Sequence, residues 1–212
     1  MTRTTSKPSK KESILNAAEE LFALHGYDGV TIRQIANKAN VDVALASYHF
    51  GKKLDLFETV FFRRAKILND VRLKALKECE KKAGPDGPNV ESIVEAFLRP
   101  LASIPDDDQD GWKNYYALVA YINSSPTWGK LLMNKHFDPL VSHFINALRK
   151  ALKGISESDL YWGYHYMSGA LTLTLAQTER IDRLSNNLCK SSDLEAAYDR
   201  MIPFITAGFK KL

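Results

Sequence analysis

Apolar residues recur at spacings of three and four along most of this 212-residue chain, and stretches in which apolar and polar residues alternate are almost absent. A period near 3.6 is that of an amphipathic α-helix with one buried face, whereas a half-buried strand needs a period of two. The pattern therefore predicts an all-α fold in which each helix buries one stripe of side chains.

The first predicted helix begins after Ser9, which forms a capping box with Glu12, and it ends at Gly26. Residues 1–8 precede it as a basic arm, which we expect to be disordered. The stripe that this helix buries consists of Ile14, Ala18, Leu21 and Phe22.

Two shorter helices follow. Thr31 and Gln34 form a second capping box, which starts a helix over about residues 32–39, and Asp42 caps a third helix over residues 43–50. Helices this short are not stable alone, so both must pack on the first helix. The three together match the helix-turn-helix unit, and we predict a DNA-binding domain over residues 9–53.

A long helix is predicted over about residues 53–83, and it ends in the turn sequence Gly-Pro-Asp-Gly-Pro at residues 84–88. We expect this helix to link the first domain to a second, larger helical domain over residues 84–212, with Pro139 and Pro203 each starting, kinking or splitting a helix. The helices expected in the second domain cover residues 90–104, 112–123, 127–153, 157–182 and 193–210, with an acidic loop from Asp106 to Gly111.

Composition narrows the class of protein. The chain is 45% apolar and 25% charged, as in ordinary globular proteins, and it lacks the roughly 18 consecutive apolar residues that span a bilayer. We therefore expect a cytoplasmic protein with no membrane partner. The net charge of +4 is uneven, because residues 1–82 carry 16 basic and 10 acidic residues. A basic N-terminal part suits contact with phosphate, although it is also typical of a solvated surface.

An enzyme is the first rival interpretation. His136 and His143 flank Asp138, so a metal or hydrolytic site can be imagined there, but the spacings fit no catalytic template such as HExxH or GxSxG. Cys79 and Cys189 lie far apart and form no CxxC pair, so we expect two reduced thiols. We predict no catalytic residues, no metal and no cofactor.

The predicted third helix has a composition suited to the major groove of DNA, which admits one α-helix. Ala44, Ser47, Tyr48 and His49 can point outward as small, hydroxyl and imidazole contacts. Lys52 and Lys53 follow at the turn into the long helix, where ammonium groups can hold phosphate. Tyr48 could equally pack under the first helix.

The sequence also resembles the TetR/AcrR family of regulators. The residues that carry the resemblance are G-V-T-I-R-Q-I-A at 29–36, A-L-A-S-Y-H-F-G at 44–51, and Lys53 with Leu56-Phe57. They lie within about residues 10–60. The aromatic pair usual before His-Phe is reduced here to Ser47-Tyr48, which puts one base or phosphate contact in doubt but not the fold.

The resemblance implies a role for each matching residue. Thr31 and Lys53 hold phosphates on either side of the groove, while Arg33 and the outward side chains of the third helix face the bases. A guanidinium can pair with both acceptors of guanine, so Arg33 is the preferred base reader, its alternative being a solvated side chain. The full predicted DNA-binding set is Thr31, Arg33, Gln34, Ala44, Ser47, Tyr48, His49, Lys52 and Lys53.

The second domain is rich in aromatic residues, which suit an apolar pocket with a few polar tips but are also typical of plain core. The predicted effector-pocket residues are Trp112, Tyr115, Tyr116, Val119, Trp128, Phe137, Trp162, Tyr166 and Met167. The segment 162–171, W-G-Y-H-Y-M-S-G-A-L, faintly resembles a branch of the family that includes fatty-acid-responsive regulators. It implies a small hydrophobic effector such as a fatty acid or another acyl compound.

Members of the family pair through their last two long helices, and small residues along 157–182 would let a second helix approach closely. The predicted homodimer contacts are Leu160, Gly163, Gly169, Leu171, Leu175, Phe204, Ile205 and Phe209, although a buried helix within one chain has the same composition. A twofold dimer implies double-stranded DNA with an inverted-repeat operator. The resemblance thus implies a repressor that its effector releases. The second rival is a constitutive or architectural DNA-binding factor without a ligand.

Overall fold

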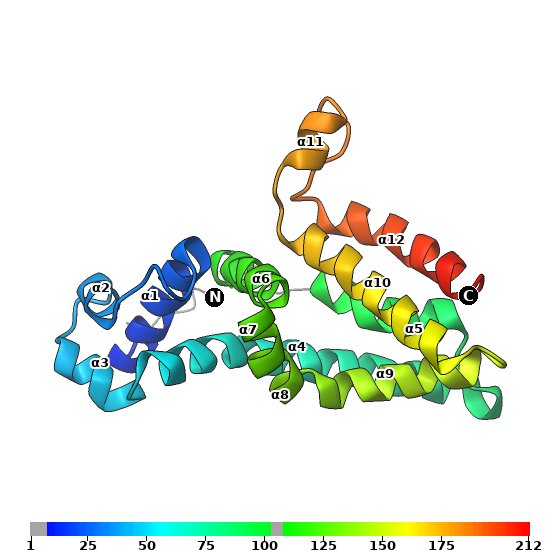
Figure 1. The fold of residues 1–212 in the computed structure, drawn as a ribbon, viewed down its shortest axis with the longest axis horizontal. Helices are drawn as coiled ribbons and strands as arrows, with labels where there is room; N and C mark the ends of the chain where they lie inside the picture. The colour runs from blue at the N-terminus through cyan, green and yellow to red at the C-terminus, as the bar shows by residue number, and fades with distance from the viewer. Residues whose placement is uncertain (1–7, 103–107) are drawn as a thin grey trace, which may run out of the picture.

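The computed structural model describes residues 8–102 and 108–212, and within these ranges the fold is all-α, as predicted (Figure 1). The basic arm and the predicted loop residues Asp106 and Asp107 lie outside the described residues, apart from residue 8 at the end of the arm. The N-terminal helices match the predicted ones closely: α1 Lys10–His25, α2 Ile32–Lys38, α3 Val43–Phe50 and α4 Lys53–Ala83.

Local capping sets these boundaries. The Ser9 hydroxyl accepts a hydrogen bond from the Glu12 amide at 3.2 Å, and the Glu12 carboxylate accepts one from the Ser9 amide at 2.8 Å. At the other end of α1, Gly26 adopts φ 67°, a conformation that suits glycine because it has no Cβ. The capping pattern in the sequence therefore locates both ends of α1.

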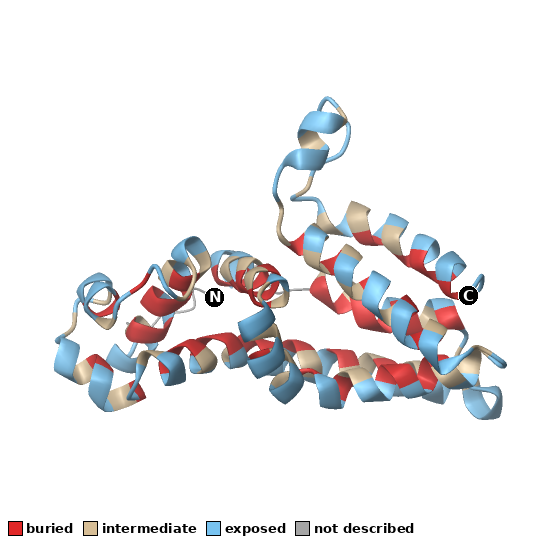
Figure 2. Ribbon diagram, viewed as in Figure 1, coloured by how far each residue is buried: buried red, intermediate tan, exposed pale blue. Residues whose placement is uncertain are grey.

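The 31-residue helix α4 runs along the molecule and connects its two ends (Figure 1). The second module packs around its C-terminal half as α5 Val90–Leu98, α6 Gln109–Ser124, α9 Asp138–Ala151, α10 Glu157–Leu175 and α12 Leu194–Phe209. Helices α5 and α9 contact α4, and α10 and α12 cover them from the other side. One continuous hydrophobic core links the two modules (Figure 2).

Two predicted helices are shorter or more divided than the pattern indicated. The helix expected over 90–104 stops at Leu98, and a short 3-10 turn at Arg99–Leu101 contains Pro100. The segment expected as one helix over 127–153 is divided into α7 Pro126–Trp128, a π-helical turn, α8 Asn134–His136 and α9. Pro139 starts α9, where a missing backbone N–H costs no helical hydrogen bond.

The helix expected over 157–182 also ends early. α10 stops at Leu175, and both Gln177 and Glu179 have positive φ values, 43° and 56°, before the short helix α11 at Arg180–Leu184. Helix α11 and the loop after it project from the ends of α10 and α12 and are mostly exposed (Figure 2). Helix α12, by contrast, continues through Pro203 without a split.

None of the helices in the described part of the chain is long and apolar enough to cross a bilayer.

Candidate DNA-binding surface and sensor core

Side-chain caps fix the start of α2 and the start of α3. The Thr31 hydroxyl accepts from the Gln34 amide at 3.2 Å and donates to the Gln34 side-chain oxygen at 2.9 Å, and that oxygen also accepts from the Thr31 amide at 2.7 Å. Asn40 takes the left-handed conformation at φ 52°. The Asp42 carboxylate then accepts from the Ala44 amide at 2.7 Å and starts α3. The first cap starts α2 and the second starts α3, while packing on α1 and α4 completes their placement.

Helix α3 presents its polar and aromatic side chains to solvent. Ala46 and Phe50 are buried against α1 and α4, whereas Ala44 and Ser47 are exposed and Tyr48 is 83% exposed. Tyr48 therefore does not pack under α1. The remaining members of the predicted DNA-binding set on these helices are placed as follows: His49 is half-buried with its ring beside Tyr48, and Arg33 and Gln34 are exposed on α2.

The two lysines at the start of α4 differ in their surroundings. Lys52 is exposed. Lys53 is half-buried, its ammonium donates to the carbonyl oxygens of Tyr27 at 3.0 Å and Val30 at 3.1 Å, and it lies 4.0 Å from the centre of the Tyr27 ring. Two of its three N–H donors thus join α4 to the loop between α1 and α2, which leaves one for a phosphate.

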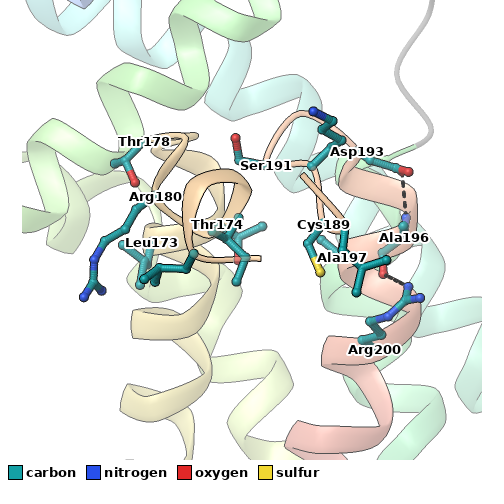
Figure 3. Close-up of a pocket in the computed structure, with 14 residues that line it drawn as sticks. Leu173, Thr174, Thr178, Arg180, Cys189, Ser191, Asp193, Ala196, Ala197 and Arg200 are labelled. Atoms are coloured by element: carbon teal, nitrogen blue, oxygen red, sulfur yellow. Dashed lines mark hydrogen bonds between the residues drawn. The ribbon is translucent and has the colours of Figure 1, made fainter. Parts of the chain in front are cut away.

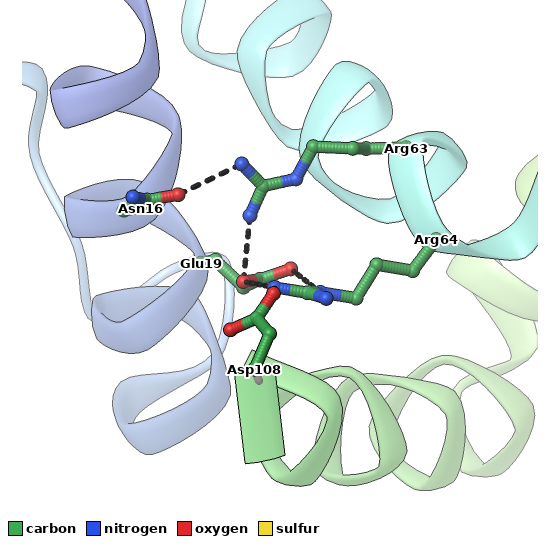
Figure 4. A network of polar contacts seen from close by, with 5 residues as sticks. All are labelled: Asn16, Glu19, Arg63, Arg64 and Asp108. Atoms are coloured by element: carbon green, nitrogen blue, oxygen red, sulfur yellow. Dashed lines mark hydrogen bonds and ion pairs between the residues drawn. The ribbon is translucent and has the colours of Figure 1, made fainter. Parts of the chain in front are cut away.

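A buried ionic cluster, formed by Glu19, Arg63, Arg64 and Asp108, joins the two modules (Figure 4). Glu19 of α1 is 2% exposed. It accepts from Arg64 Nε at 2.7 Å and Nη2 at 2.8 Å, and from Arg63 at 2.7 Å. Arg64 also forms a 2.7 Å ion pair with Asp108, which precedes α6. The cluster therefore connects the first helix of the DNA-binding unit to the second module.

Arg64 stays charged in this cluster. Burial alone lowers the pKa of its guanidinium, but the hydrogen bonds and charges of Glu19 and Asp108 outweigh this effect and raise the pKa above its ordinary value. The approach of α6 depends on Gly111, because a Cβ at that position would lie 1.8 Å from Arg64 Nη2. The sequence offered one sign of the cluster: Glu19 falls on the apolar stripe of α1, where a charge needs a partner.

A second contact between the modules involves α6, α7 and the loop after α1. The Tyr121 hydroxyl accepts from the Tyr27 amide at 3.3 Å, and its ring lies 3.0 Å from where a Cβ of Gly26 would be. The Trp128 ring packs on Tyr27 at 4.5 Å and on Phe57 at 5.2 Å between centroids. Trp128, predicted to line the effector pocket, therefore lies at the junction with the DNA-binding unit.

The predicted aromatic cluster of the second module is divided in the structure. The buried members of the set are Trp112, Tyr115, Tyr116, Val119, Phe137 and Met167. Trp162 and Tyr166 stack on each other instead on the outer face of α10, where they are 53% and 58% exposed. Trp162 and Tyr166 thus lie apart from the interior aromatics, and Tyr166 borders an open pocket between α10 and α12. Their role in effector binding stays a prediction.

An open pocket of about 510 Å³ lies between the C-terminal end of α10, the N-terminal end of α12 and the projecting helix α11 (Figure 3). Its lining includes Leu173, Ile181, Leu184, Leu188 and Arg200. None of the predicted effector residues lines it. The apolar pattern predicts one unbroken helix over 157–182, and such a helix would leave no room for this pocket.

Most of the predicted dimer contacts are covered by the chain itself. The residues buried in the packing of α10 and α12 or beside it are Leu160, Gly163, Leu171, Leu175, Ile205 and Phe209. Gly163 shows why: a Cβ there would lie 2.5 Å from the Phe209 ring. The chain itself buries these six residues, although Gly163, Ile205 and Phe209 also line an open pocket between α10 and α12. Their role in a dimer stays a prediction. Gly169 and Phe204 are exposed, Phe204 at 75%.

No group of three or more histidine, cysteine or acidic residues in the described ranges is arranged to hold a metal ion. His136 contacts Glu58 at 3.0 Å, a hydrogen bond between α8 and α4. Cys79 and Cys189 are both free thiols.

Comparison with known proteins gives matches over most of the chain. Residues 14–60 match the model of bacterial regulatory proteins of the tetR family, and residues 95–208 match the tetracyclin repressor-like C-terminal domain. The regulator BetI of Agrobacterium fabrum is 31% identical over 86 residues, 40% of each chain. The repressor BepR of Brucella suis is 30% identical over 99 residues, 46% of this chain and 44% of BepR. These matches thus span under half of either relative.

A solved structure supports the fold over nearly the whole length. A tetR-family regulator from Shewanella superimposes with a TM-score of 0.62 over 92% of this chain and 97% of its own, at 18% identity. An identity this low bears on the fold alone.

Proposed function

This chain belongs to the TetR family of helix-turn-helix transcriptional regulators, and we propose that it is a cytoplasmic repressor that binds an inverted-repeat operator as a homodimer and is released by a small hydrophobic effector. The observation that carries the proposal is the α3 surface, on which Ala44, Ser47 and Tyr48 are exposed on a helix held by its own caps.

In the proposed complex, α3 enters the major groove and its exposed side chains contact base edges. Arg33 on α2 supplies a fork of donors for guanine, and Lys52 and the remaining donor of Lys53 hold phosphates. Thr31, whose hydroxyl already donates to Gln34, would exchange that bond for a phosphate oxygen. Gln34, which is hydrogen-bonded to Thr31, and His49, whose ring lies beside Tyr48, would position these two neighbours for DNA.

The dimer surface that we propose is the outer face of α10 and α12. Its large apolar side chains are Trp162, Tyr166, Leu173 and Phe204, each more than half exposed. Apolar side chains gathered on one face are typical of an interface, and a twofold axis through this face would leave α3 free at the far end of each chain (Figure 1). Recognition helices about 34–36 Å apart would then meet successive turns of DNA.

The test is selection of DNA from a random pool by the purified protein at a stated salt concentration, followed by titration of the selected sequence. We expect an inverted repeat, bound with an affinity that falls steeply with salt. Arg33→Ala should relax the base preference at one position of the operator. Lys52→Ala should instead lower the affinity for all DNA sequences and reduce the slope of log affinity against log salt concentration by about one. Lys150→Ala, an exposed lysine on α9, serves as the control.

Recovery of a single half-site, or of no sequence above nonspecific binding, contradicts the proposal. The dimer is tested separately by light scattering of wild type and Phe204→Glu, since a charge in an apolar interface should yield monomers. Gly163→Ala is the comparison: it should lower the free energy of unfolding by overpacking the Phe209 ring, about 1–3 kcal/mol, while leaving dimerisation intact.

A further inference from the structure

Arg72 is a buried cation in the interior of the second module, 3% exposed on the inner face of α4. Its Nε donates to the carbonyl oxygen of Phe97 at 2.7 Å, and its guanidinium carbon lies 4.0 Å from the centre of the Phe97 ring. A guanidinium has five N–H donors. In the described part of the chain, this is the only hydrogen bond of Arg72, and Arg72 takes part in no ion pair. Burial accordingly lowers the pKa of its guanidinium.

Tyrosines from three other helices surround this cation. The groups with the largest electrostatic effect on Arg72 are Tyr115 and Tyr116 of α6, Tyr164 of α10 and Tyr198 of α12. The Tyr116 hydroxyl donates to a backbone carbonyl at 2.7 Å. The hydroxyls of Tyr115 and Tyr198 are fully buried, and neither has a hydrogen-bond partner among the described residues. Three side chains from three helices thus place unused donors in the same buried part of the second module.

Such an arrangement is costly unless something accepts these hydrogen bonds. An unpaired buried charge and unpaired buried hydroxyls each lose the hydration that they have in the unfolded chain. The other buried arginine, Arg64, is balanced by Glu19 and Asp108. Arg72 has no such partner, and the hydroxyls of Tyr115 and Tyr198 each have a free hydrogen to donate. The group that would satisfy them together is an anion.

We propose that Arg72, with the hydroxyls of Tyr115 and Tyr198, binds the anionic head group of the effector, and that this effector is a hydrophobic monocarboxylate. One guanidinium neutralises one negative charge, which favours a carboxylate over a dianionic phosphate. Two oxygens can accept from the guanidinium fork and from both phenols. The neighbouring core side chains are aromatic and aliphatic, which suits an apolar body once the packed helices move apart to admit it. This inference rests on the proposed function, whose effector it specifies.

The experiment is calorimetric titration and thermal unfolding of the full chain, free of DNA, with octanoate, decanoate, dodecanoate, benzoate and phenylacetate below their micellar concentrations. The methyl ester of each acid is the neutral match. We expect at least one acid to bind with one site per chain and to raise the melting temperature. Its methyl ester should bind at least about tenfold more weakly, because it carries no charge for Arg72.

Variants assign the binding to these side chains. Arg72→Met should lower the affinity for the acid about 10- to 100-fold, and Tyr198→Phe should lower it about three- to tenfold, because each substitution removes a hydrogen bond to the carboxylate. Lys74→Met, on the exposed side of the same helix, should bind as wild type does. Circular dichroism and urea unfolding of Arg72→Met show whether it remains folded.

The proposal is overturned if no acid of the series binds, if acids and their esters bind equally, or if Arg72→Met binds as tightly as wild type. None of these readouts uses DNA, so a failure to select an operator leaves them valid. Conversely, a chain that selects an inverted repeat and binds no carboxylate keeps the proposed function and loses this inference.

Discussion

Two arginines on the same face of α4 have opposite surroundings. Arg64 lies at the junction of the modules and is bound by Glu19 and Asp108. Arg72, two turns further along or about 12 Å away, lies in the core of the second module with one backbone carbonyl as its hydrogen-bond partner. Both are almost fully buried. The protein thus neutralises the charge of Arg64 with its own carboxylates, whereas the charge of Arg72 is available to the carboxylate of the proposed effector.

The comparison also assigns different tasks to the two regions. At the junction, the charges of Arg63 and Arg64 are matched by those of Glu19 and Asp108, so this region is balanced in charge, and Arg63 Nε is its one polar atom known to lack a partner among the described residues. In the core, Arg72 has one hydrogen-bond acceptor, and the hydroxyls of Tyr115 and Tyr198 have no partner among the described residues. A cluster with balanced charges is suited to coupling the two modules, whereas a buried cation without a counter-ion is suited to binding an anionic ligand.

The largest effect is expected from Arg64→Met. It leaves the buried Glu19 with only Arg63, and loss of one partner from a buried ion pair costs about 3–5 kcal/mol. Urea unfolding of the ligand-free protein measures this loss directly. A change below about 1 kcal/mol would mean that the cluster does not stabilise the junction, and would break the comparison.

The same substitution at Arg72 should have the opposite sign. Arg72→Met removes an unpaired buried charge and keeps an apolar side chain of similar length, so we expect the free energy of unfolding to rise, by about 1–4 kcal/mol. Lys74→Met is the matched surface control and should stay within about 0.5 kcal/mol of wild type. A loss of stability in Arg72→Met would show that the Phe97 carbonyl and ring already satisfy the guanidinium.

A pair of neighbouring tyrosines sharpens the comparison within the core. Tyr116→Phe removes a hydroxyl that donates to the Leu101 carbonyl and should cost about 1 kcal/mol. Tyr115→Phe removes a hydroxyl without a partner in the described part of the chain and should cost nothing or stabilise slightly. Both are measured by urea unfolding. Equal losses would contradict the assignment of Tyr115 as an unused donor.

The smallest effect is expected at Glu20, next to Glu19 in sequence. Its 2.7 Å ion pair with Lys38 is exposed to solvent, so Glu20→Gln should cost about 0.2–1 kcal/mol and less at high salt. Glu19→Gln, measured beside it with and without added salt, should cost several times more and depend little on salt. Equal costs would indicate that burial does not distinguish the two glutamates.

The sequence predicted the DNA-binding unit well because its signals are local. Ser9, Thr31 and Asp42 cap helices within three residues of themselves, and the apolar stripes then decide which face of α3 is exposed. The early end of α10 had no such signal, because the residues that adopt positive φ there are Gln177 and Glu179 rather than glycine.

Contacts between distant segments were not predictable in the same way. The pairing of Glu19 with Arg64 spans 45 residues, and no local pattern encodes it. Small residues on α10 allowed two interpretations, and at Gly163 the structure shows close packing of the Phe209 ring from the same chain. The isolation of Arg72 is visible only once four helices meet around it.

The position of the ionic cluster along α4 has a mechanical consequence. With Arg64 held on both sides, it is a pivot for a stiff 31-residue rod, with Arg72 about 12 Å to one side and Lys53 about 16 Å to the other. A displacement of about 1 Å at Arg72 then moves Lys53 by about 1.4 Å in the opposite direction. In a symmetric pair of chains the two movements add to almost 3 Å, close to the roughly 3.4 Å between successive nucleotides of one strand. A small displacement in the core is therefore geometrically sufficient to change the spacing of the two recognition helices of a dimer by almost one nucleotide step of DNA.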